Sequence, residues 1–439
     1  MSTLRETFFW LLDTFRGGKV KSEVKDVQRL LTIGEGSEMY GVGNERLRQL
    51  LDHACGTTEF YSPYANSDGI ADFPVLNKNI IRDNFKAFLS KEYKLSALQQ
   101  VVTSGSTGTP FKVLHSSRKK LRNTADTIYF AERAGFKVGD RLLYLKIWAK
   151  EKMKSPLTYW LQNLEPVDVI HLDEVQISKI ISNMEKSRTS FAILGYVSAL
   201  ELVCRFLEKN YKEKVKTRVS SIITMSESLN SYVKTTLEKY FDAEVFSRYS
   251  NLENGIIAQQ VPGCDQKFLV NTASYFVEIL APNEDKPVRP GELGRIVVTD
   301  LYNYAMPLIR YDTGDIGAFS AEAGLNLYFD KIEGRKLDVL YDTRGGIVSS
   351  YIMYKNMWKY TEILQYQLIQ RDSKQYLLKV NHDGSFAREE NLVKEFKSYL
   401  GADADFSVEY VSEIPLLASG KRRKLVNEMV ERGIRDKAH

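Results

Sequence analysis

The chain has few of the side chains from which most protein metal sites are built. It contains only three cysteines, Cys55, Cys204 and Cys264, and five histidines, with no CxxC pair and no Cys/His cluster. Structural zinc and iron–sulfur sites need several such ligands at short spacings, so the sequence excludes them. Scattered, unpaired cysteines also fit a reducing compartment, and we therefore expect a cytoplasmic protein.

Long apolar runs are also lacking. Near the N-terminus the run Phe8 to Leu12 is flanked by Glu6 and Asp13. It is too short and too acidic for a signal peptide or a membrane span, so we expect neither. One face of a helix there would carry Leu4, Phe8, Leu11, Leu12 and Phe15. Because the polar face is poor in Lys and Arg, we predict that the apolar face packs on the protein itself, with docking to a membrane or partner left open.

No charge of one sign dominates. The 61 basic and 56 acidic side chains give a net charge of only +5, and the short basic run Lys421 to Lys424 is the one local excess of note. This balance argues against a nucleic-acid partner. The hydrophobic fraction of 43% and the charged fraction of 27% are those of an ordinary globular protein. A length of 439 residues predicts at least two domains.

Alternating short β-rich runs and helical segments occupy the middle of the chain. The expected strands are 142–145, 191–195, 219–224, 244–250 and 276–280, and the expected helices are 173–185, 197–211 and 228–240. This alternation predicts an α/β layered domain with parallel strands, and the later strands predict an appended antiparallel part. We assign residues 1–334 to this large domain.

After Gly334 the pattern changes. A hairpin is expected over 365–370 and 375–380, a helix over 390–400 that ends at Gly401, and a strand over 405–411. Two strands, a helix and a strand in about a hundred residues are typical of a small α+β domain. We assign residues 335–439 to it.

The stretch TSGSTGTPFK, residues 103–112, combines five hydroxyl side chains with two glycines. Backbone N–H groups in such a turn, helped by hydroxyls, form a concave nest for phosphate oxygens. The spacing matches neither the Walker A loop nor GxGxxG. A flexible linker would have no reason to follow directly on the strand-like Val101-Val102 and to end in Pro-x-Lys, so we predict a polyphosphate loop.

Four more stretches place chemically useful side chains beside turns. They are RYSNLENG (248–255), PLIRYDTGDIG (307–317), IEGRKLD (332–338) and PLLASGKRRK (415–424). Taken singly, each has a local explanation: a solvated turn acid, an Asx turn, a surface linker and a solvated basic helix face. Their order along the chain is the more informative observation.

The succession TSGSTGTPFK, YSNLE, GELG (291–294), RYDTGD, GRKLD and PLLASGK resembles the ordered core motifs of the adenylate-forming superfamily, which includes acyl-CoA ligases, luciferases and peptide-synthetase adenylation domains. The resemblance covers roughly residues 45–425. LLDHACGTTEFY, FPVLNKNIIRDNF, ILGYVSAL and ILQYQLIQ are similar to segments of phenylacetate-CoA ligases and their relatives in capsule and O-antigen gene clusters. The fold implied is the adenylate-forming one, with the α+β domain as a small mobile lid.

The resemblance implies an AMP-forming ligase that uses ATP and Mg²⁺. A carboxylate would attack the α-phosphate to give an acyl adenylate and pyrophosphate, and an acceptor would then displace AMP. Lys421 would bridge the carboxylate and the α-phosphate, and Glu253 would hold Mg²⁺, which suits one carboxylate plus phosphate oxygens and water. The other ATP-binding residues implied are Thr103, Ser104, Gly105, Ser106, Thr107, Gly108 and Lys112 at the β- and γ-phosphates, Ser226, Glu227 and Tyr249 at adenine, Asp315 at the ribose hydroxyls, and Arg335 at phosphate or ribose.

The acyl pocket and the acceptor are less closely specified. Trp148, Tyr196 and Met225, with Tyr249, are candidate pocket walls because ligand pockets are mostly apolar and aromatic, although such residues also build cores. We expect a small carboxylate as substrate and coenzyme A or an amine, such as an amino sugar, as acceptor. A homodimer is left open.

Two departures from the family pattern support an alternative. Phe111 separates Pro110 from Lys112, where many relatives have lysine directly after proline, and Leu337 stands where many carry an Asp or Lys hinge. These changes would suit a nucleotide-binding or scaffold protein that keeps the fold and has lost the chemistry. The retained Glu253, Asp315 and Lys421 favour an enzyme, because drift would not selectively spare three charged positions.

Overall fold

The structure is a computed structural model that describes most of the chain. The described residues are 2–33, 37–103, 111–148, 155–169, 172–322, 326–335, 340–345, 347–348, 357, 360, 362–382, 384–415 and 424–429. They fall into two compact units. The first comprises most of residues 1–332, and the second comprises residues 333–439 with the short segments 230–232 and 314–316.

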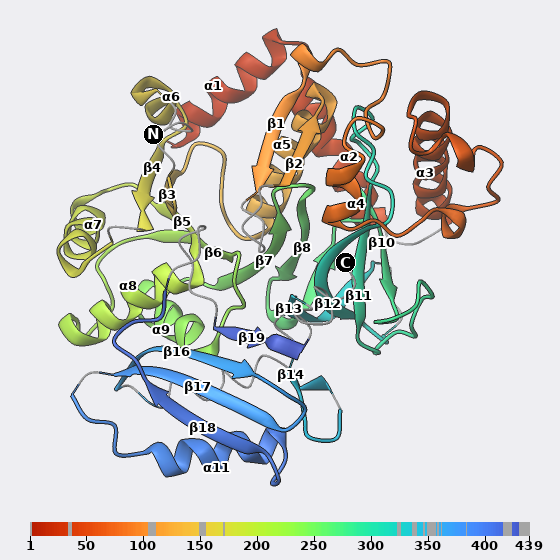
Figure 1. The fold of residues 1–439 in the computed structure, drawn as a ribbon. Helices are drawn as coiled ribbons and strands as arrows, with labels where there is room; N and C mark the ends of the chain where they lie inside the picture. Colours follow the sequence, from red (N-terminus) through yellow and green to blue (C-terminus); the bar gives the residue numbers. More distant parts are fainter. Residues whose placement is uncertain are drawn as a thin grey trace. The chain divides into compact units, whose positions relative to one another are not determined.

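Five parallel strands form one half of the main sheet. They are β3 (Arg141–Lys146), β4 (Leu164–Asp168), β5 (Phe191–Tyr196), β6 (Val219–Met225) and β7 (Val245–Asn251), in the spatial order β4-β3-β5-β6-β7. Helices α6 (Pro156–Leu161), α7 (Glu174–Lys186), α8 (Val197–Asn210) and α9 (Ser231–Phe241) connect them. Figure 1 shows these strands side by side with α7, α8 and α9 beside them. The predicted alternation of strands and helices is therefore confirmed.

Local chemistry accounts for where these elements begin. The side chain of Asp173 accepts a hydrogen bond from the N–H of Gln176 at 2.8 Å, which caps the first turn of α7. The buried residues of α7, Ile177, Ile181 and Met184, recur at helical spacing on one face. β6, by contrast, is buried over five consecutive residues, as expected of a strand covered on both faces.

Antiparallel strands complete the main sheet of the described residues, which has 11 strands. β8 (Gly255–Val261) and β9 (Cys264–Val270) continue from β7, and β13 (Tyr328–Arg335), β12 (Tyr311–Phe319), β11 (Gly294–Asp300) and β10 (Tyr275–Leu280) follow in that spatial order. Gly294 pairs so closely beside β10 that a Cβ would clash with the carbonyl oxygen of Leu280. The predicted antiparallel part is confirmed as a direct extension of the parallel half.

A hairpin and two helices form a separate core at the N-terminal side of the first unit. β1 (Gln99–Thr103) pairs antiparallel with β2 (Phe111–His115), and α3 (Ser37–Thr57) and α4 (Lys78–Asp83) pack with it. Short 3₁₀ turns lie at Ser62–Tyr64, Ile70–Asp72 and Leu95–Ala97. Asn77 caps α4 by accepting from the N–H groups of Asn79 and Ile80.

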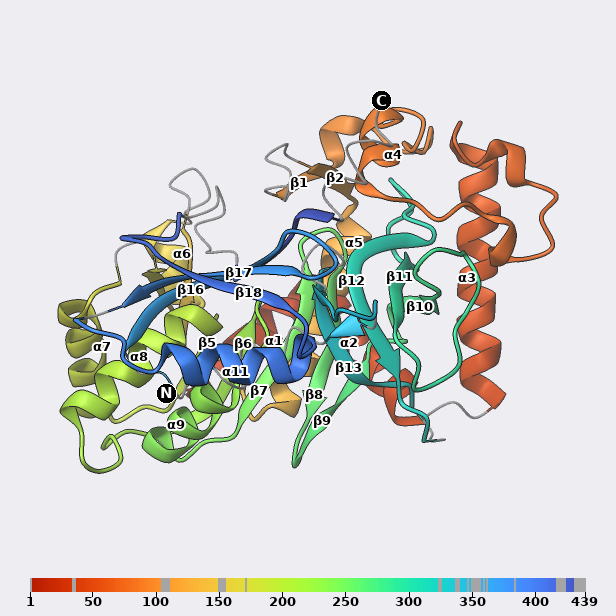
Figure 2. The ribbon, with the colours of Figure 1, turned by 60° about the horizontal axis from the view of Figure 1, so that its bottom comes forward.

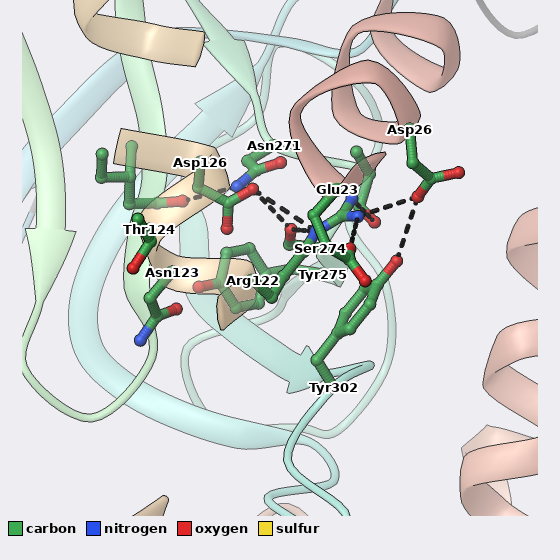
Figure 3. A network of polar contacts seen from close by, with 12 residues as sticks. Glu23, Asp26, Arg122, Asn123, Thr124, Asp126, Asn271, Ser274, Tyr275 and Tyr302 are labelled. Carbon is green, nitrogen blue, oxygen red and sulfur yellow. Dashed lines mark hydrogen bonds and ion pairs between the residues drawn. The ribbon is translucent and has the colours of Figure 1, made fainter. Parts of the chain in front are cut away.

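Arg122 of α5 (Ser117–Arg133) anchors α2 (Lys19–Ile33) through a buried polar network (Figure 3). Its fully buried guanidinium donates to Glu23 at 2.9 Å, Asp26 at 2.8 Å and Ser274 at 2.7 Å. The ring of Tyr302 lies 4.2 Å from the guanidinium carbon. Burial raises the pKa of the Asp26 carboxyl, but hydrogen bonds from Arg46 and Arg122 outweigh it and lower that pKa to about 2. Three segments distant in sequence are thus joined by one ionised cluster.

The apolar face of α1 (Ser2–Phe15) corrects one prediction. The residues predicted to pack on the protein itself are exposed instead. Their exposed fractions run from 38% at Leu12 to 85% at Phe15, and the set is Leu4, Phe8, Leu11, Leu12 and Phe15. Asp13 on the opposite side is buried and accepts from the N–H groups of Val20 and Lys21 at the start of α2. The inward side of α1 is therefore set by the capping carboxylate of Asp13 rather than by the apolar stripe.

The second unit is a small α+β layer. Its four-stranded sheet has the order β18-β17-β16-β19, from β16 (Ile363–Gln370), β17 (Gln375–His382), β18 (Asp405–Tyr410) and β19 (Leu425–Asn427). α11 (Glu389–Leu400) covers one face of it, as Figure 2 shows. The buried Leu392, Phe396 and Leu400 of α11 join one core with Leu368 and Leu378.

The predicted hairpin, helix and strand of this unit are confirmed, including the helix end at Gly401, whose φ is +123°. Two features were not predicted. β19 pairs parallel to β16, and β14 (Leu340–Tyr341) pairs with β15 (Ile347–Val348) in a small separate ladder. Strands of two or three residues carry too little alternation to be recognised in a sequence.

Candidate active site

The predicted phosphate loop connects the two strands of the β1–β2 hairpin. Thr103 is the last residue of β1 and pairs with Phe111, the first residue of β2. Residues 104–110 lie outside the described part of the chain, and Ser104, Gly105, Ser106, Thr107 and Gly108 are among them. A polyphosphate-binding role for this loop therefore stays a prediction.

The structure explains the unusual Phe111. Its ring is 1% exposed and stacks on Tyr311, with 6.1 Å between centroids and an interplanar angle of 5°. Because side chains alternate along a strand, burying Phe111 turns Lys112 to the opposite, exposed side, where its ammonium lies 5.1 Å from the Phe85 ring. Phe111 anchors the hairpin to the core, and the cation that follows it remains accessible.

Glu253 is the centre of a compact polar site. It lies in the turn between β7 and β8 and is only 3% exposed. Its Oε1 atom lies 2.7 Å from the ammonium of Lys78 at the start of α4 and accepts the hydroxyl of Tyr311 at 2.9 Å. The Nε2–H of His115 donates to its backbone carbonyl at 2.8 Å. Residues from three other segments thus converge on Glu253, two of them on its buried carboxylate.

The charges at this site are well defined. Burial lowers the pKa of the His115 imidazole, so the ring is neutral at pH 7 and can act as the N–H donor to the Glu253 carbonyl. The carboxylate of Glu253 is balanced by the Lys78 ammonium, which is itself 5.4 Å from the Phe111 ring. The sequence analysis missed Lys78 and Tyr311, because their link to Glu253 spans 175 and 58 residues of chain, respectively, and no spacing reveals it.

Tyr249 also takes part in a contact between distant segments. Its hydroxyl donates to Oγ1 of Thr313 at 3.2 Å, and Thr313 in turn donates to the carbonyl of Ile296. The ring edge of Tyr249 meets Phe329 at 6.3 Å. The YSNLE and RYDTGD motifs, far apart in sequence, therefore meet at Tyr249 and Thr313.

The turn after β6 is strained and capped. Ser226 has φ of +69°, a left-handed conformation that is uncommon outside glycine and clusters at functional sites. Both carboxylate oxygens of Glu227 bind Ser198 at the start of α8, one accepting its N–H at 2.6 Å and the other its hydroxyl at 3.1 Å. The side chain of Glu227 thus satisfies a helix N-terminus.

For the remaining residues predicted to bind ATP, the structure gives fewer contacts. Asp315 lies on β12 and is half-buried, and Arg335 is the last residue of β13. Lys421 lies outside the described residues. Nearby, Lys424 directly precedes β19, and its ammonium lies 5.1 Å from the Tyr366 ring.

The predicted acyl-pocket residues do come together. Tyr196 and Met225 are paired residues at the ends of β5 and β6. The hydroxyl of Tyr144 on β3 approaches the sulfur of Met225 at 3.9 Å, and the indole of Trp148 meets the Tyr144 ring edge-on at 5.4 Å. Ligands of open α/β sheets bind beyond the carboxyl ends of parallel strands, which is where this cluster lies.

Neither a conventional metal cluster nor a membrane span is found in the part of the chain that the structure describes. No group of three or more His, Cys, Asp or Glu side chains there could hold a metal ion. No helix there is long and apolar enough to cross a bilayer. The carboxylate of Glu253 nevertheless fits Mg²⁺ in the way that nucleotide enzymes use it, with phosphate oxygens and water supplying the other ligands.

Two comparisons with known sequences agree with each other. Residues 340–428 match the family model of the CapK C-terminal domain. The chain is 23% identical to Protein CapK of Staphylococcus aureus, over 92% of this chain and 92% of that protein.

Solved structures show a similar fold over most of the chain. It resembles 2-hydroxyisobutyryl-CoA ligase bound to 2-HIB-AMP in the postadenylation state, with a TM-score of 0.70, 15% identity and 92% coverage of each chain. The chain has the adenylate-forming ligase fold. This confirms the resemblance predicted from the order of the motifs. ATP-bound MatB from Rhodopseudomonas palustris shares the fold with a TM-score of 0.54 and 15% identity, over 80% of this chain and 71% of MatB.

Proposed function

We propose that this chain is an ATP-dependent, AMP-forming ligase that activates a small carboxylate. An oxygen of the carboxylate attacks the α-phosphorus, the bond to the β-phosphate oxygen breaks, and pyrophosphate leaves with its electron pair. Two anions must approach each other in this step, so catalysis depends mostly on charge neutralisation and positioning. The chain's part is to supply and place the positive charges.

One observation carries the proposal: the buried Glu253 site is built beside the hairpin that bears the hydroxyl-rich loop. Phe111 and His115, at the two ends of β2, contact Tyr311 and the backbone of Glu253, respectively. A catalytically lost scaffold would not need a carboxylate that is 3% exposed and held by Lys78 and Tyr311. The fold shared with ligases bound to ATP and to acyl-AMP supports the same assignment.

We assign each residue the role that the resemblance implies. Glu253 would hold Mg²⁺, which would supply positive charge to neutralise the departing phosphates. Residues 103–108 with Lys112 hold the β- and γ-phosphates, Tyr249 with the 226–227 turn borders adenine, and Asp315 accepts the ribose hydroxyls. Lys421, carried by the second unit acting as a lid, bridges the substrate carboxylate and the α-phosphate, and Arg335 neutralises phosphate or ribose.

Two acceptors remain for the second half-reaction, in which AMP is displaced. Coenzyme A is supported by the structural neighbours, one of which was solved with 2-HIB-AMP and CoA. An amine or amino-sugar acceptor is supported by the full-length similarity to Protein CapK and by the CapK C-terminal domain match, which favour a role in capsule polysaccharide biosynthesis. Incubating the enzyme-bound adenylate with each acceptor and weighing the products separates the two.

The decisive test is carboxylate-dependent exchange of labelled pyrophosphate into ATP, with pooled aryl, fatty, hydroxy, dicarboxylic and amino acids. We expect exchange with at least one pool, requiring Mg²⁺, and its loss in Glu253→Gln. Absence of exchange with every pool, together with no ATP binding by calorimetry, would instead support the scaffold alternative.

A further inference from the structure

Arg248 of β7 is a buried cation without a counter-ion among the described residues. The residue is 7% exposed, and its Nε–H donates to the amide oxygen of Gln259 at 2.8 Å. The Nη2 atom is buried and has no hydrogen-bond partner in the described part of the chain. Charged side chains are almost never fully buried unless they are paired, because desolvating an unpaired ion costs several kcal/mol.

The surroundings of Arg248 do not replace the missing anion. Burial raises the pKa of the Tyr144 hydroxyl to about 12, so this neighbour is neutral at pH 7. Burial also lowers the pKa of Arg248 to about 10, which still leaves the guanidinium charged at pH 7. Gln259 is fixed by its own bond to the carbonyl of Phe130 at 2.6 Å and acts as a support that orients Arg248.

Arg248 lies on the same face of the sheet as residues of the predicted acyl pocket. In the parallel half of the sheet, Tyr196 pairs with Met225 and Met225 pairs with Arg248, so the three side chains lie on one face at the end of the parallel pairing. The Tyr144 hydroxyl contacts Met225, and Trp148 packs on Tyr144. We call these five residues, Tyr144, Trp148, Tyr196, Met225 and Arg248, the distal cluster.

We propose that Arg248 recognises a second carboxylate at the far end of the substrate, so that the acid activated here is a dicarboxylic acid. This inference rests on the proposed function, since the near carboxylate is the one that reacts with ATP. The planar guanidinium binds a carboxylate through two parallel N–H donors, which supplies the partner that Nη2 lacks. The apolar and aromatic members of the distal cluster would enclose the carbon chain between the two carboxylates.

The test compares straight-chain dicarboxylic acids of increasing length with monocarboxylic acids of the same length, in pyrophosphate exchange by the full-length protein. We expect kcat/KM for the best dicarboxylate to exceed that of its methyl-terminated analogue by at least about a hundredfold, since a site built for a polar group rejects the analogue that leaves it unpaired. Arg248→Met should reverse this preference. Arg248→Gln should abolish it.

Controls separate recognition from folding. Arg248→Met should melt at the same temperature as the wild type or higher, because it removes an unpaired buried charge. Arg141→Gln, at the opposite end of β3 where Arg141 pairs with Glu165 at 2.7 Å, removes one positive charge and should leave the preference unchanged. Calorimetric binding of the dicarboxylate, present in the wild type and lost in Arg248→Met, provides a readout that does not depend on activity.

The outcomes distinguish the two proposals. Suppose that monocarboxylates and dicarboxylates support equal exchange and that Arg248→Met changes neither rate. This result overturns the role of Arg248 and leaves the ligase function intact. Dicarboxylate binding that requires Arg248, without exchange for any acid, keeps the recognition site and rejects the ligase. A preference for acids with a neutral hydroxyl or amide end also overturns the dicarboxylate assignment.

Discussion

At the scale of single residues, the Lys78–Glu253 pair is the feature that most changes the view of the site. The ammonium of Lys78 lies 2.7 Å from a carboxylate oxygen of Glu253, the residue predicted to bind the metal ion. On the proposed function, Mg²⁺ held by Glu253 would displace part of the Lys78 contact, and phosphates would offer Lys78 a new partner. The pair therefore orients Glu253 before nucleotide arrives.

A double-mutant cycle tests this coupling. Lys78→Met, Glu253→Gln and the double variant are unfolded in urea without nucleotide, and we expect a coupling free energy of about 1–3 kcal/mol, because a buried carboxylate loses its cation. Tyr311→Phe is the matched control for the neutral hydrogen bond and should couple to Glu253→Gln more weakly, by about 0.5–1.5 kcal/mol. Additive effects of Lys78→Met and Glu253→Gln would show that the pair stabilises nothing.

At the scale of elements, the Arg122 network ties α2 to α5 and to the main sheet. α2 meets α5 through Glu23 and Asp26, and the network continues to Ser274 at the start of β10 (Figure 3). Arg122 and Asp126 are fully buried, whereas Glu23 and Asp26 are partly exposed. The network therefore adds polar contacts to the apolar packing of Val27, Leu30 and Leu31 of α2 against α5.

This network predicts a pH dependence of stability. The pKa of Asp26 is about 2 in the folded protein, below the ordinary value near 3.9 of an unfolded chain. A lowered pKa stabilises the folded state fully above about pH 4, and this contribution disappears as the pH falls toward 2. We expect the difference in free energy of unfolding between wild type and Asp26→Asn, measured in urea from pH 5 to pH 2, to shrink below about pH 4. A constant difference across that range would contradict the assignment.

At the scale of the whole molecule, the second unit has its own core and carries the lysine on which adenylation is proposed to depend. We expect Lys421→Ala to lower carboxylate-dependent pyrophosphate exchange by about a hundredfold to a thousandfold, the loss of one charge-assisted contact in the transition state. Transfer from a synthetic acyl adenylate should survive, because the lysine acts only in the first half-reaction.

Lys424→Ala is the matched control for Lys421→Ala. Lys424 belongs to the same basic run but lies against the Tyr366 ring within the second unit, so its loss should leave exchange nearly unchanged. Wild-type exchange in Lys421→Ala, or equal losses in the two variants, would assign the bridging role to another residue.

The sequence by itself determined the elements and their order. Helical and strand periodicity located β3, β5, β6, β7, α7, α8 and α11, because side-chain alternation is a local property of the backbone. The order of the glycine- and hydroxyl-rich motifs was enough to indicate the adenylate-forming fold. The helix end at Gly401 was equally readable, since a helix end needs its partner within a few positions.

Only the tertiary structure decided which charges meet. Lys78 and Glu253 are separated by 175 residues, and nothing in the local sequence of Lys78 distinguishes it from a surface lysine. Arg248 reads equally well as a solvated strand residue until its neighbours Met225 and Gln259 show it to be enclosed. The apolar stripe of α1 was placed wrongly for the same reason. Periodicity determines which side chains share a face, but the packing of distant segments determines whether that face is buried.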